Sequence, residues 1–298
     1  GGLPAAGETI RLESRYLRVS LDSETGHWSL LDKQSGVTWP TQGNASPGKT
    51  GETPPVLRLG QHSSRAARFE TEKGPHVTYT VTDGGRALEI AFGGEVPGEI
   101  QFLGDALTIQ GNENGSVIVP SREGLLIPAN SGVAFQREFG TSDYEGCHMN
   151  MLGFVKDGSA LIATWDDAYV FPEIERTVSG GSKLVTTFEL RGPARSVRLT
   201  PLGKGDWNTI AAAYLEYANK KGWAVSLKEK AERTPHLARM FGASNAKLWT
   251  CLARRMNEES TAEESVKVRW TFDEAARIAE HLKNDLQIDR CLFMIGGW

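Results

Sequence analysis

The sequence predicts a β-rich chain of several domains. These are an N-terminal antiparallel β-sandwich (1–205), a helical linker (206–245) and the opening βαβ unit of a TIM-type barrel (246–298). Two observations support the division. Of the 13 prolines, 12 lie before residue 206, as do 29 of the 33 glycines. After that point the period of apolar residues changes from two to about 3.6. Because glycine and proline punctuate strands and are kept out of helix interiors, a boundary is expected near Gly205.

Residues 1–205 alternate apolar and polar side chains in short segments, as antiparallel strands with one buried face do. The turn sequences SETG, TDGG and KDGS separate several of them. Many short strands at roughly 8–12-residue spacing are typical of a large sandwich or barrel. The expected strands are Tyr16–Asp22, His27–Lys33, Pro55–Leu59, Ala67–Lys73, His76–Asp83 and Ala87–Gly93, followed by SVIVP, GFVKDGSALIATW, KLVTTFELRG and SVRLTPLG.

Helix signals begin at Asp206, which is placed to cap a helix over Trp207–Lys221. Ser226 opens a second helix with the capping box SLKE, and Pro235 breaks that helix. A short helical turn then ends at Gly242, a residue type favoured at helix C-termini.

Two near-continuous apolar runs follow, AKLWTCLA (Ala246–Ala253) and RCLFMIGGW (Arg290–Trp298). Between them, TFDEAARIAEHLKNDL (Thr271–Leu286) predicts an amphipathic helix that opens with the capping box TFDE. Apolar strands joined by a crossover helix predict a parallel βαβ unit, whose strands are buried on both faces. Trp249 is therefore expected in the core, and the buried stripe of the helix is expected to be Phe272, Ala275, Ala276, Ala279 and Leu282.

Two parallel strands cannot bury both of their own faces. We therefore expect polypeptide outside these 298 residues, either a C-terminal continuation or a second chain, to complete the barrel. It would cover the side chains of Leu248, Cys251, Leu292 and Met294.

The composition excludes several classes of partner and cofactor. The net charge is −4, and lysines and arginines are spread along the chain, which argues against nucleic acid or an anionic membrane surface. No apolar run reaches ~18 residues, so no membrane span is predicted. The three cysteines (Cys147, Cys251 and Cys291) form no CxxC or Cys/His cluster, so neither a metal nor another cofactor is expected. Gly1 and Gly2 look like the remnant of a trimmed leader or of a tag. If a leader was removed, an extracellular or periplasmic protein is expected.

The gap between Ala253 and Thr271 is the most informative feature for function. A βα loop normally takes ~2–6 residues, whereas the segment Ala253–Trp270, ARRMNEESTAEESVKVRW, has 18. In an α/β barrel this loop leaves the carboxyl end of a strand, where active sites lie. Trp298 would face the same rim and offers a stacking surface for a sugar ring. The candidate substrate-binding residues are Trp298, Arg254, Arg255 and Trp270.

Other polar residues have simpler interpretations. Glu258, Glu259, Glu263 and Glu264 stand among four basic residues in a polar segment, as is usual on a solvated surface. The pair of acidic residues Asp166 and Asp167 is either a turn or a group that reaches across from the sandwich. His148 with Asp143 and Glu145 is a possible acid–base set, although a lone histidine is more often an ordinary hydrogen-bonded residue.

Three stretches carry a family resemblance: LRVSLDSETGHWSLLDKQSGVTW, GDWNTIAAAYLEYANKKGWAVSLKEKAERTPHLARMFGASNAKLW and FMIGGW. With them the chain resembles bacterial glycoside hydrolases related to endo-α-N-acetylgalactosaminidases and α-N-acetylgalactosaminidases. The match is most specific over Asp206–Gly242, and Gly296-Gly297-Trp298 matches the end of the second barrel strand. The resemblance implies a galactose-mutarotase-like β-supersandwich followed by a (β/α)8 catalytic barrel. The catalytic carboxylates of that group lie on later strands, so none is assigned to this sequence.

The function that the resemblance implies is hydrolysis of an O-glycosidic bond in a complex carbohydrate, with α-linked N-acetylgalactosamine as one candidate. The catalytic residues are expected C-terminal to Trp298. One alternative is a non-catalytic carbohydrate-binding or scaffold module centred on the sandwich. Another is a mutarotase-like isomerase that uses His148 or His76 with a glutamate.

Overall fold

The structure is a computed structural model that describes residues 7–40, 57–72, 74–95, 98–102, 107–141 and 143–297. The chain divides into two compact units, Gly1–Ala218 and Asn219–Trp298. Each unit is described on its own. Within the described part of the chain, no helix is both long enough and apolar enough to cross a membrane.

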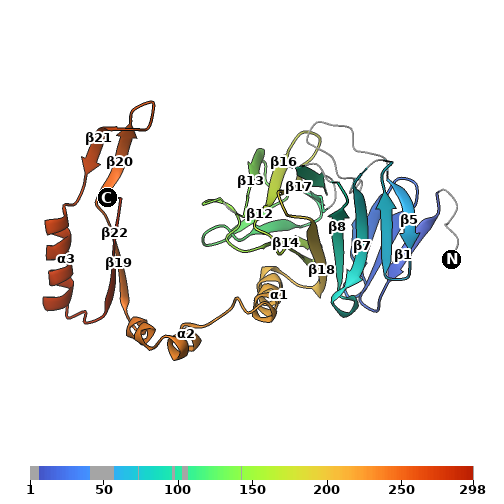
Figure 1. The fold of residues 1–298 in the computed structure, drawn as a ribbon. Coiled ribbons are helices and arrows are strands. Elements are labelled where there is room, and N and C mark those ends of the chain that lie inside the picture. The colour runs from blue at the N-terminus through green and yellow to red at the C-terminus, as the bar shows by residue number, and fades with distance from the viewer. Residues whose placement is uncertain are drawn as a thin grey trace. The chain divides into compact units, whose positions relative to one another are not determined.

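Among the described residues, the first unit contains three antiparallel sheets (Figure 1). A four-stranded sheet has the order β1-β2-β3-β4, with β1 Thr9–Glu13, β2 Leu17–Asp22, β3 Trp28–Asp32 and β4 Thr38–Pro40. A five-stranded sheet has the order β10-β17-β16-β13, and β9 also pairs with β17. Its strands are β9 Glu99–Phe102, β10 Ile109–Gln110, β13 Phe135–Glu138, β16 Val170–Thr177 and β17 Lys183–Arg191.

The largest described sheet has nine strands in the order β12-β11-β14-β15-β18-β8-β7-β6-β5. Between residues 55 and 200, the described part of the chain contains no helix longer than the 3-10 turn η1 (Asp83–Gly85), as an antiparallel β-sandwich requires. The nine strands are β5 Arg58–His62, β6 Ala66–Glu70, β7 His76–Thr82, β8 Ala87–Gly93, β11 Ser116–Val119, β12 Leu125–Pro128, β14 Met151–Lys156, β15 Ser159–Thr164 and β18 Ser196–Lys204.

The three sheets share one apolar core, because each contributes every second residue of its strands. Aromatic side chains join the layers: Trp39 meets Phe154 edge-on with ring centroids 6.4 Å apart, and Trp165 meets Phe188 at 5.8 Å. The prediction of an antiparallel β-sandwich from strand alternation is confirmed. Sequence alternation did not identify β1, β4, β9, β10, β12, β13 and β16.

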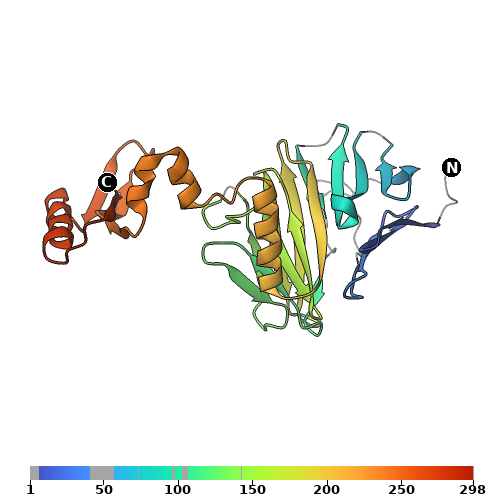
Figure 2. The same ribbon diagram turned by 90° about the horizontal axis from the view of Figure 1, so that it is seen from below.

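Helix α1 (Trp207–Lys220) covers the outer face of the nine-stranded sheet (Figure 2). As predicted, the helix starts at Asp206, whose carboxylate accepts a hydrogen bond of 2.9 Å from the backbone N–H of Asn208. Ile210 of α1 is fully buried against Met151, Ala160 and Ile162 of strands β14 and β15. Strands β14 and β15 are therefore buried on both faces.

The second unit opens with α2 (Leu227–Arg233) and the 3-10 helix η2 (Pro235–Met240). The predicted capping box is present, since Ser226 accepts from the N–H of Glu229 and the Glu229 carboxylate accepts from the N–H of Ser226. Pro235 occupies the start of η2, where its missing N–H costs nothing. Gly242 follows with a φ of +68°, a left-handed conformation that favours glycine.

The predicted parallel βαβ unit is confirmed. Strand β19 (Ser244–Trp249) pairs in parallel with β22 (Cys291–Gly296), with Ser244 opposite Cys291 and Trp249 opposite Gly296. Helix α3 (Phe272–Asn284) connects them and begins at the predicted capping box of Thr271 and Glu274. The remainder of a barrel is still a prediction.

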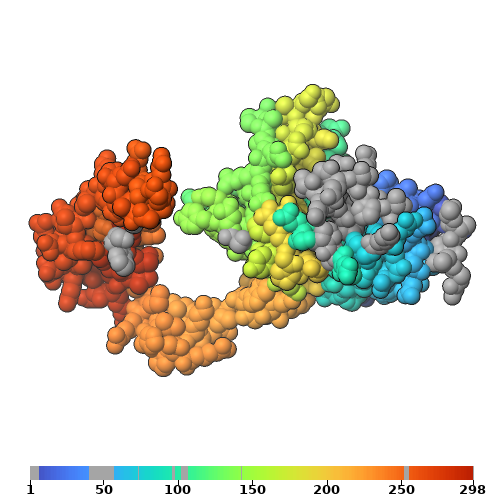
Figure 3. Space-filling model, turned by 45° about the horizontal axis from the view of Figure 1, so that its top comes forward, coloured from blue at the N-terminus to red at the C-terminus, as the bar shows by residue number. Residues whose placement is uncertain are grey.

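Two details of this unit differ from the sequence-based predictions. The strand expected over Ala246–Ala253 is divided at Thr250, which is buried and donates its N–H to the carbonyl of Gly296. Beyond Thr250 the chain leaves β22 and pairs with a new partner. Residues expected to form a long loop are instead an antiparallel hairpin of β20 (Cys251–Met256) and β21 (Glu263–Val268), which stands out from the unit (Figure 3).

The expectations about burial were also partly wrong. Of the stripe expected on α3, Ala275 is buried, Ala279 and Leu282 are half-buried, and Phe272 and Ala276 are exposed. Trp249, expected in the core, is 43% exposed with the Lys247 ammonium 4.3 Å from its ring centroid. The physical reason is that the faces of β19 and β22 are incompletely covered within the described residues. The prediction that further polypeptide covers them remains a prediction.

Candidate functional site

A cavity of about 410 Å³ lies where β22 ends and the hairpin begins, at the carboxyl end of the parallel strand pair. Its walls come from three places in the sequence: the β20–β21 hairpin, the start of α3 and the end of β22. The lining residues are Thr250, Cys251, Glu263, Val266, Val268, Trp270, Thr271, Phe272 and Gly297. The volume is within the range of roughly 300–1,000 Å³ that small-molecule sites occupy.

Backbone hydrogen bonds at Thr250 bring these segments together. The carbonyl of Gly296 accepts from the N–H of Thr250 at 2.9 Å, and the Thr250 carbonyl accepts from the N–H groups of Arg269 and Trp270 at 2.8 and 3.3 Å. The chain that returns from the hairpin is thereby fixed against the end of β22. This arrangement places Trp270 at the cavity directly before α3.

The start of α3 forms the wall next to Trp270. Thr271 Oγ1 accepts from the N–H of Glu274 at 3.2 Å, and the Glu274 carboxylate accepts from the N–H of Thr271 at 2.9 Å. Hydrogen bonds from the backbone N–H and then the hydroxyl of Thr271 lower the pKa of Glu274, which therefore stays ionised near the positive end of the helix. Phe272, the first helical residue, extends into solvent beside this cap and lines the cavity.

Of the predicted substrate-binding residues, the structure brings Trp270 to the cavity. Arg255 is elsewhere on the hairpin, where its guanidinium forms an exposed ion pair of 2.9 Å with Glu264. Arg254 lies in β20 opposite Val266, and only its backbone is described. Trp298 lies outside the described residues, although its neighbour Gly297 lines the cavity.

The cavity also contains residues that the sequence-based prediction did not select, chiefly Val266, Val268 and Phe272. The alternating pattern SVKV at Ser265–Val268 was a usable signal, because it is typical of a strand with one apolar face. The sequence-based prediction missed this pattern because the segment also contains several acidic residues. Asn257 closes the hairpin turn, since its side-chain oxygen accepts from the N–H groups of Thr261 and Ala262 at 2.8 and 2.9 Å.

Glycoside hydrolysis requires two carboxyl groups on either side of the bond to be cleaved. Among the described residues that line the cavity, Glu263 carries the single carboxyl group. The described part of the chain therefore supplies a wall and an aromatic side chain for such a site, and not a catalytic pair.

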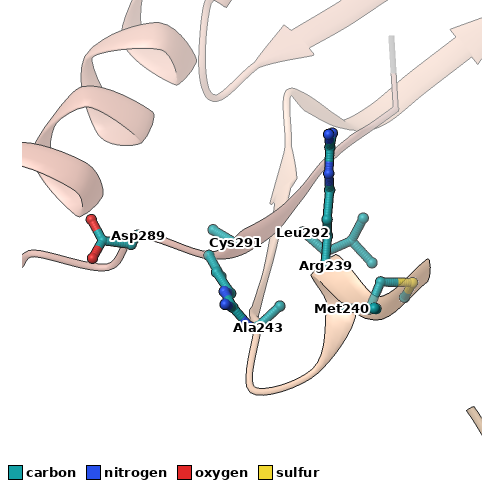
Figure 4. Close-up of a pocket in the computed structure, with 8 residues that line it drawn as sticks. Arg239, Met240, Ala243, Asp289, Cys291 and Leu292 are labelled. Atoms are coloured by element: carbon teal, nitrogen blue, oxygen red, sulfur yellow. The ribbon is translucent and has the colours of Figure 1, made fainter. Parts of the chain in front are cut away.

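A second cavity, of about 590 Å³, lies at the opposite, amino end of the two strands (Figure 4). Its wall includes Arg239, Met240, Asp289, Arg290 and Leu292. The Arg290 guanidinium donates to the Phe241 carbonyl at 3.0 Å. Ligands of parallel α/β sheets bind outside the carboxyl ends of the strands. The cavity at the carboxyl ends is therefore the better candidate for function.

The histidines considered for acid–base chemistry are held by the sandwich. Nδ1 of His148 accepts from the N–H of Arg122 at 3.2 Å, and Nε2 lies 2.9 Å from the Tyr144 carbonyl. Both ring nitrogens are thus used by the backbone and are not available to a substrate in this arrangement. The ring of His76 packs on Gly93, and burial, followed by the charge of Arg68, lowers its pKa. These contacts favour structural roles over the isomerase alternative.

The two acidic residues that follow Trp165 have different roles. Asp166 accepts a hydrogen bond from the hydroxyl of Tyr217, so it helps to hold α1 against the sandwich. Asp167 accepts from the N–H of Tyr169 at 2.8 Å, which is the turn role that the sequence favoured.

With this geometry established, the fold can be compared with known proteins. No family model matches the sequence, and no curated protein sequence matches it. Solved structures do match, and they share the fold of this chain. The α-N-acetylgalactosaminidase NagBb of Bifidobacterium bifidum, without ligand, superimposes with a TM-score of 0.75 at 15% identity, over 97% of this chain and 52% of that chain.

Two further structures of the same enzyme agree. Its GalNAc complex gives a TM-score of 0.73 at 15% identity, and a quadruple mutant gives 0.74 at 16%, each over 97% of this chain and 52% of that chain. The chain therefore spans about half the length of the solved structures that it matches. At this level of identity the comparison establishes a glycoside-hydrolase-like fold.

Proposed function

We propose that this chain is the N-terminal part of a glycoside hydrolase that cleaves O-glycosidic bonds of complex carbohydrates, with α-linked N-acetylgalactosamine as the favoured substrate. The β-sandwich carries the start of a (β/α)8 barrel, and the catalytic carboxylates come from barrel strands C-terminal to Trp298. A C-terminal continuation or a second chain would supply those strands. The observation that carries the proposal is the cavity with Trp270 at the carboxyl ends of β19 and β22.

The position of that cavity supports carbohydrate chemistry. In α/β barrels the residues that act on substrate lie at the carboxyl ends of the strands. Trp270 is 41% exposed there, so its indole has apolar surface available for the apolar face of a pyranose. The β20–β21 hairpin adds a wall that a short βα connection would not provide.

The likeness to NagBb supports the choice of substrate. It extends over both units of the chain, including the βαβ unit that bears the cavity. The name of that enzyme gives its substrate class, and we extend this class to the present protein as a proposal. The aromatic ring in the cavity is compatible with it.

The direct test is an assay of the complete gene-encoded polypeptide on a panel of aryl α- and β-glycosides. We expect hydrolysis of the aryl α-N-acetylgalactosaminide in preference to the other sugars, and no turnover by residues 1–298 alone. Activity on none of the glycosides would contradict the proposal.

The role of Trp270 is tested by Trp270→Ala in the active polypeptide. Loss of one aromatic stacking surface of about 1–3 kcal/mol predicts a roughly ten- to hundredfold lower kcat/KM. Trp207→Ala is the matched control, because Trp207 is similarly exposed, at 55%, on the first turn of α1. Equal losses in both variants would show that Trp270 has no special part in binding.

A non-catalytic carbohydrate-binding module is the second candidate, favoured by the single carboxyl group among the described lining residues. The same assay, together with a glycan-binding measurement on the complete polypeptide, separates the two functions, because a binding module binds glycan and shows no turnover. We further propose an extracellular or periplasmic location, which cell fractionation would test.

A further inference from the structure

The hydroxyl groups in the wall of the cavity at the carboxyl end of β22 already form hydrogen bonds within the protein. Thr250 Oγ1 donates to the Gly296 carbonyl at 3.1 Å, and Thr271 Oγ1 is engaged on both sides with Glu274. Cys251 and Glu263 each have an interaction partner as well. A sugar oxygen that accepted from the hydroxyl of Thr250 or Thr271 would have to displace a hydrogen bond that the protein makes to itself.

The apolar side chains of the same wall are uncovered. Val266 is 42% exposed, Val268 62% and Phe272 63%, and all three line one cavity together with Trp270. Val266 and Val268 are two residues apart on β21 and so share one face of the hairpin. Single exposed apolar residues are ordinary on a protein surface, whereas a concave group of four marks a binding site.

We propose that this cavity binds an apolar substituent carried by the sugar ligand, and not the hydroxylated edge of the ring. The inference rests on the proposed function and adds which chemical part of the ligand contacts the hairpin. Two parts of a glycoside have this chemistry: the methyl of an acylated amino group, and an apolar aglycone. In both cases Val268 contributes a methyl surface to the contact.

The test is saturation-transfer difference NMR on the 298-residue chain itself, which requires binding and no turnover. The ligands are phenyl 2-acetamido-2-deoxy-α-galactoside, its methyl glycoside and phenyl α-galactoside. We expect the apolar substituent to receive at least about twice the saturation of the ring protons, because it lies closest to the valine and aromatic side chains. Dominant transfer to the acetyl methyl identifies the acyl group as the occupant, and dominant transfer to the phenyl protons in both phenyl glycosides identifies the aglycone.

The matched variant is Val268→Thr, which keeps the shape of the side chain and exchanges a methyl for a hydroxyl. We expect it to raise the Kd of the phenyl acetamido ligand roughly three- to tenfold. Val133→Thr is the control, since Val133 is 67% exposed in the first unit and does not line the cavity. Both side chains lie at the surface, so the variants are expected to fold.

Failure of this inference can be distinguished from failure of the proposed carbohydrate binding. Binding with saturation mainly on the ring protons, unchanged by Val268→Thr, would overturn this inference and leave carbohydrate binding in place. An equal effect of Val133→Thr would also overturn it. Absence of saturation with all three ligands would overturn the inference and count against carbohydrate binding by this chain as well.

Discussion

The carboxylate of Asp32, at the end of β3, accepts a hydrogen bond of 2.9 Å from the backbone N–H of Gly203, 171 residues later in β18. The same carboxyl group accepts from the N–H of Gln34 at 2.9 Å and from the hydroxyl of Ser35 at 2.7 Å. Asp32 is 1% exposed. One buried side chain therefore closes a turn of the four-stranded sheet and joins that sheet to the nine-stranded one.

The Asp32–Gly203 contact predicts that Asp32→Ala destabilises the first unit by about 2–3 kcal/mol, because it leaves the buried Gly203 N–H without its acceptor. Urea unfolding followed by near-UV circular dichroism measures the loss. Asp143→Ala, at an exposed aspartate of the same unit, is expected to change stability by less than about 0.5 kcal/mol. Equal effects of the two substitutions would show that the contact contributes nothing particular.

The docking of α1 depends on the lack of a side chain at Gly153 in β14. A Cβ at that position would lie 2.8 Å from Cγ2 and 2.9 Å from Cδ1 of Ile210, a fully buried residue. Gly153→Ala is therefore expected to cost about 1–3 kcal/mol through overpacking. Gly132→Ala is the control, because nothing lies within 4 Å of its added Cβ. Thermal melting that ranks Gly132→Ala as the more damaging change would contradict this packing.

The four-stranded sheet should show a specific sensitivity to acid. Hydrogen bonds from Lys33 and then Arg18 lower the pKa of Glu13 from 4.5 to about 2. A carboxyl group whose pKa is lower in the folded state stabilises the protein above its unfolded pKa, and this contribution is lost as pH falls through the folded value. The contribution is thus complete above pH 4.5 and disappears towards pH 2.

Glu13→Gln removes the titrating group, so the variant should be less stable than the parent at pH 6 and should approach it as pH falls below 4.5. Urea unfolding at pH 6, 4 and 2.5 measures this convergence. Because Glu13 is exposed to solvent and its partners Lys33 and Arg18 are partly exposed, 1 M salt should reduce the difference in stability between the variant and the parent at pH 6. A difference between the two proteins that is constant with pH would exclude Glu13 as its source.

The cysteines should differ in reactivity. Burial raises the pKa of the Cys147 thiol to about 12, so at pH 8 it holds almost no thiolate, the form that reacts. Cys251 and Cys291 are half-buried. Titration of the native chain with a disulfide reagent at pH 8 should show at most two fast thiols, and the third should appear on unfolding. Rapid labelling of Cys147 in the native chain, located by mass spectrometry, would show that the buried segment around it opens readily.

Much of the local structure follows from short-range chemistry in the sequence. Ser226, Thr271 and Asp206 were identified as helix starts because capping depends on residues three positions apart or fewer. The strands that alternate cleanly, such as β2 and β7, were identified for the same reason. Short strands such as β10 and β12 contain too few residues to show the alternation of apolar and polar side chains.

The candidate site was predicted in part. Its place after the first strand of the parallel pair and the contribution of Trp270 came from the length of the segment Ala253–Trp270 and its position before the helix. The sequence did not predict the hairpin in this segment or the ion pair between Arg255 and Glu264. Antiparallel pairing depends on contacts between residues that are separated in the sequence.

The sequence by itself determined where helices begin, which segments alternate as strands and that β19 and β22 would be parallel, since these depend on neighbouring residues or on a period repeated along one segment. Only the tertiary structure decided which strands are neighbours in each sheet, that Asp32 reaches Gly203 and that Val266, Val268 and Trp270 share a cavity wall. These are contacts across the fold, and their energy depends on the mutual fit of surfaces that no local pattern encodes.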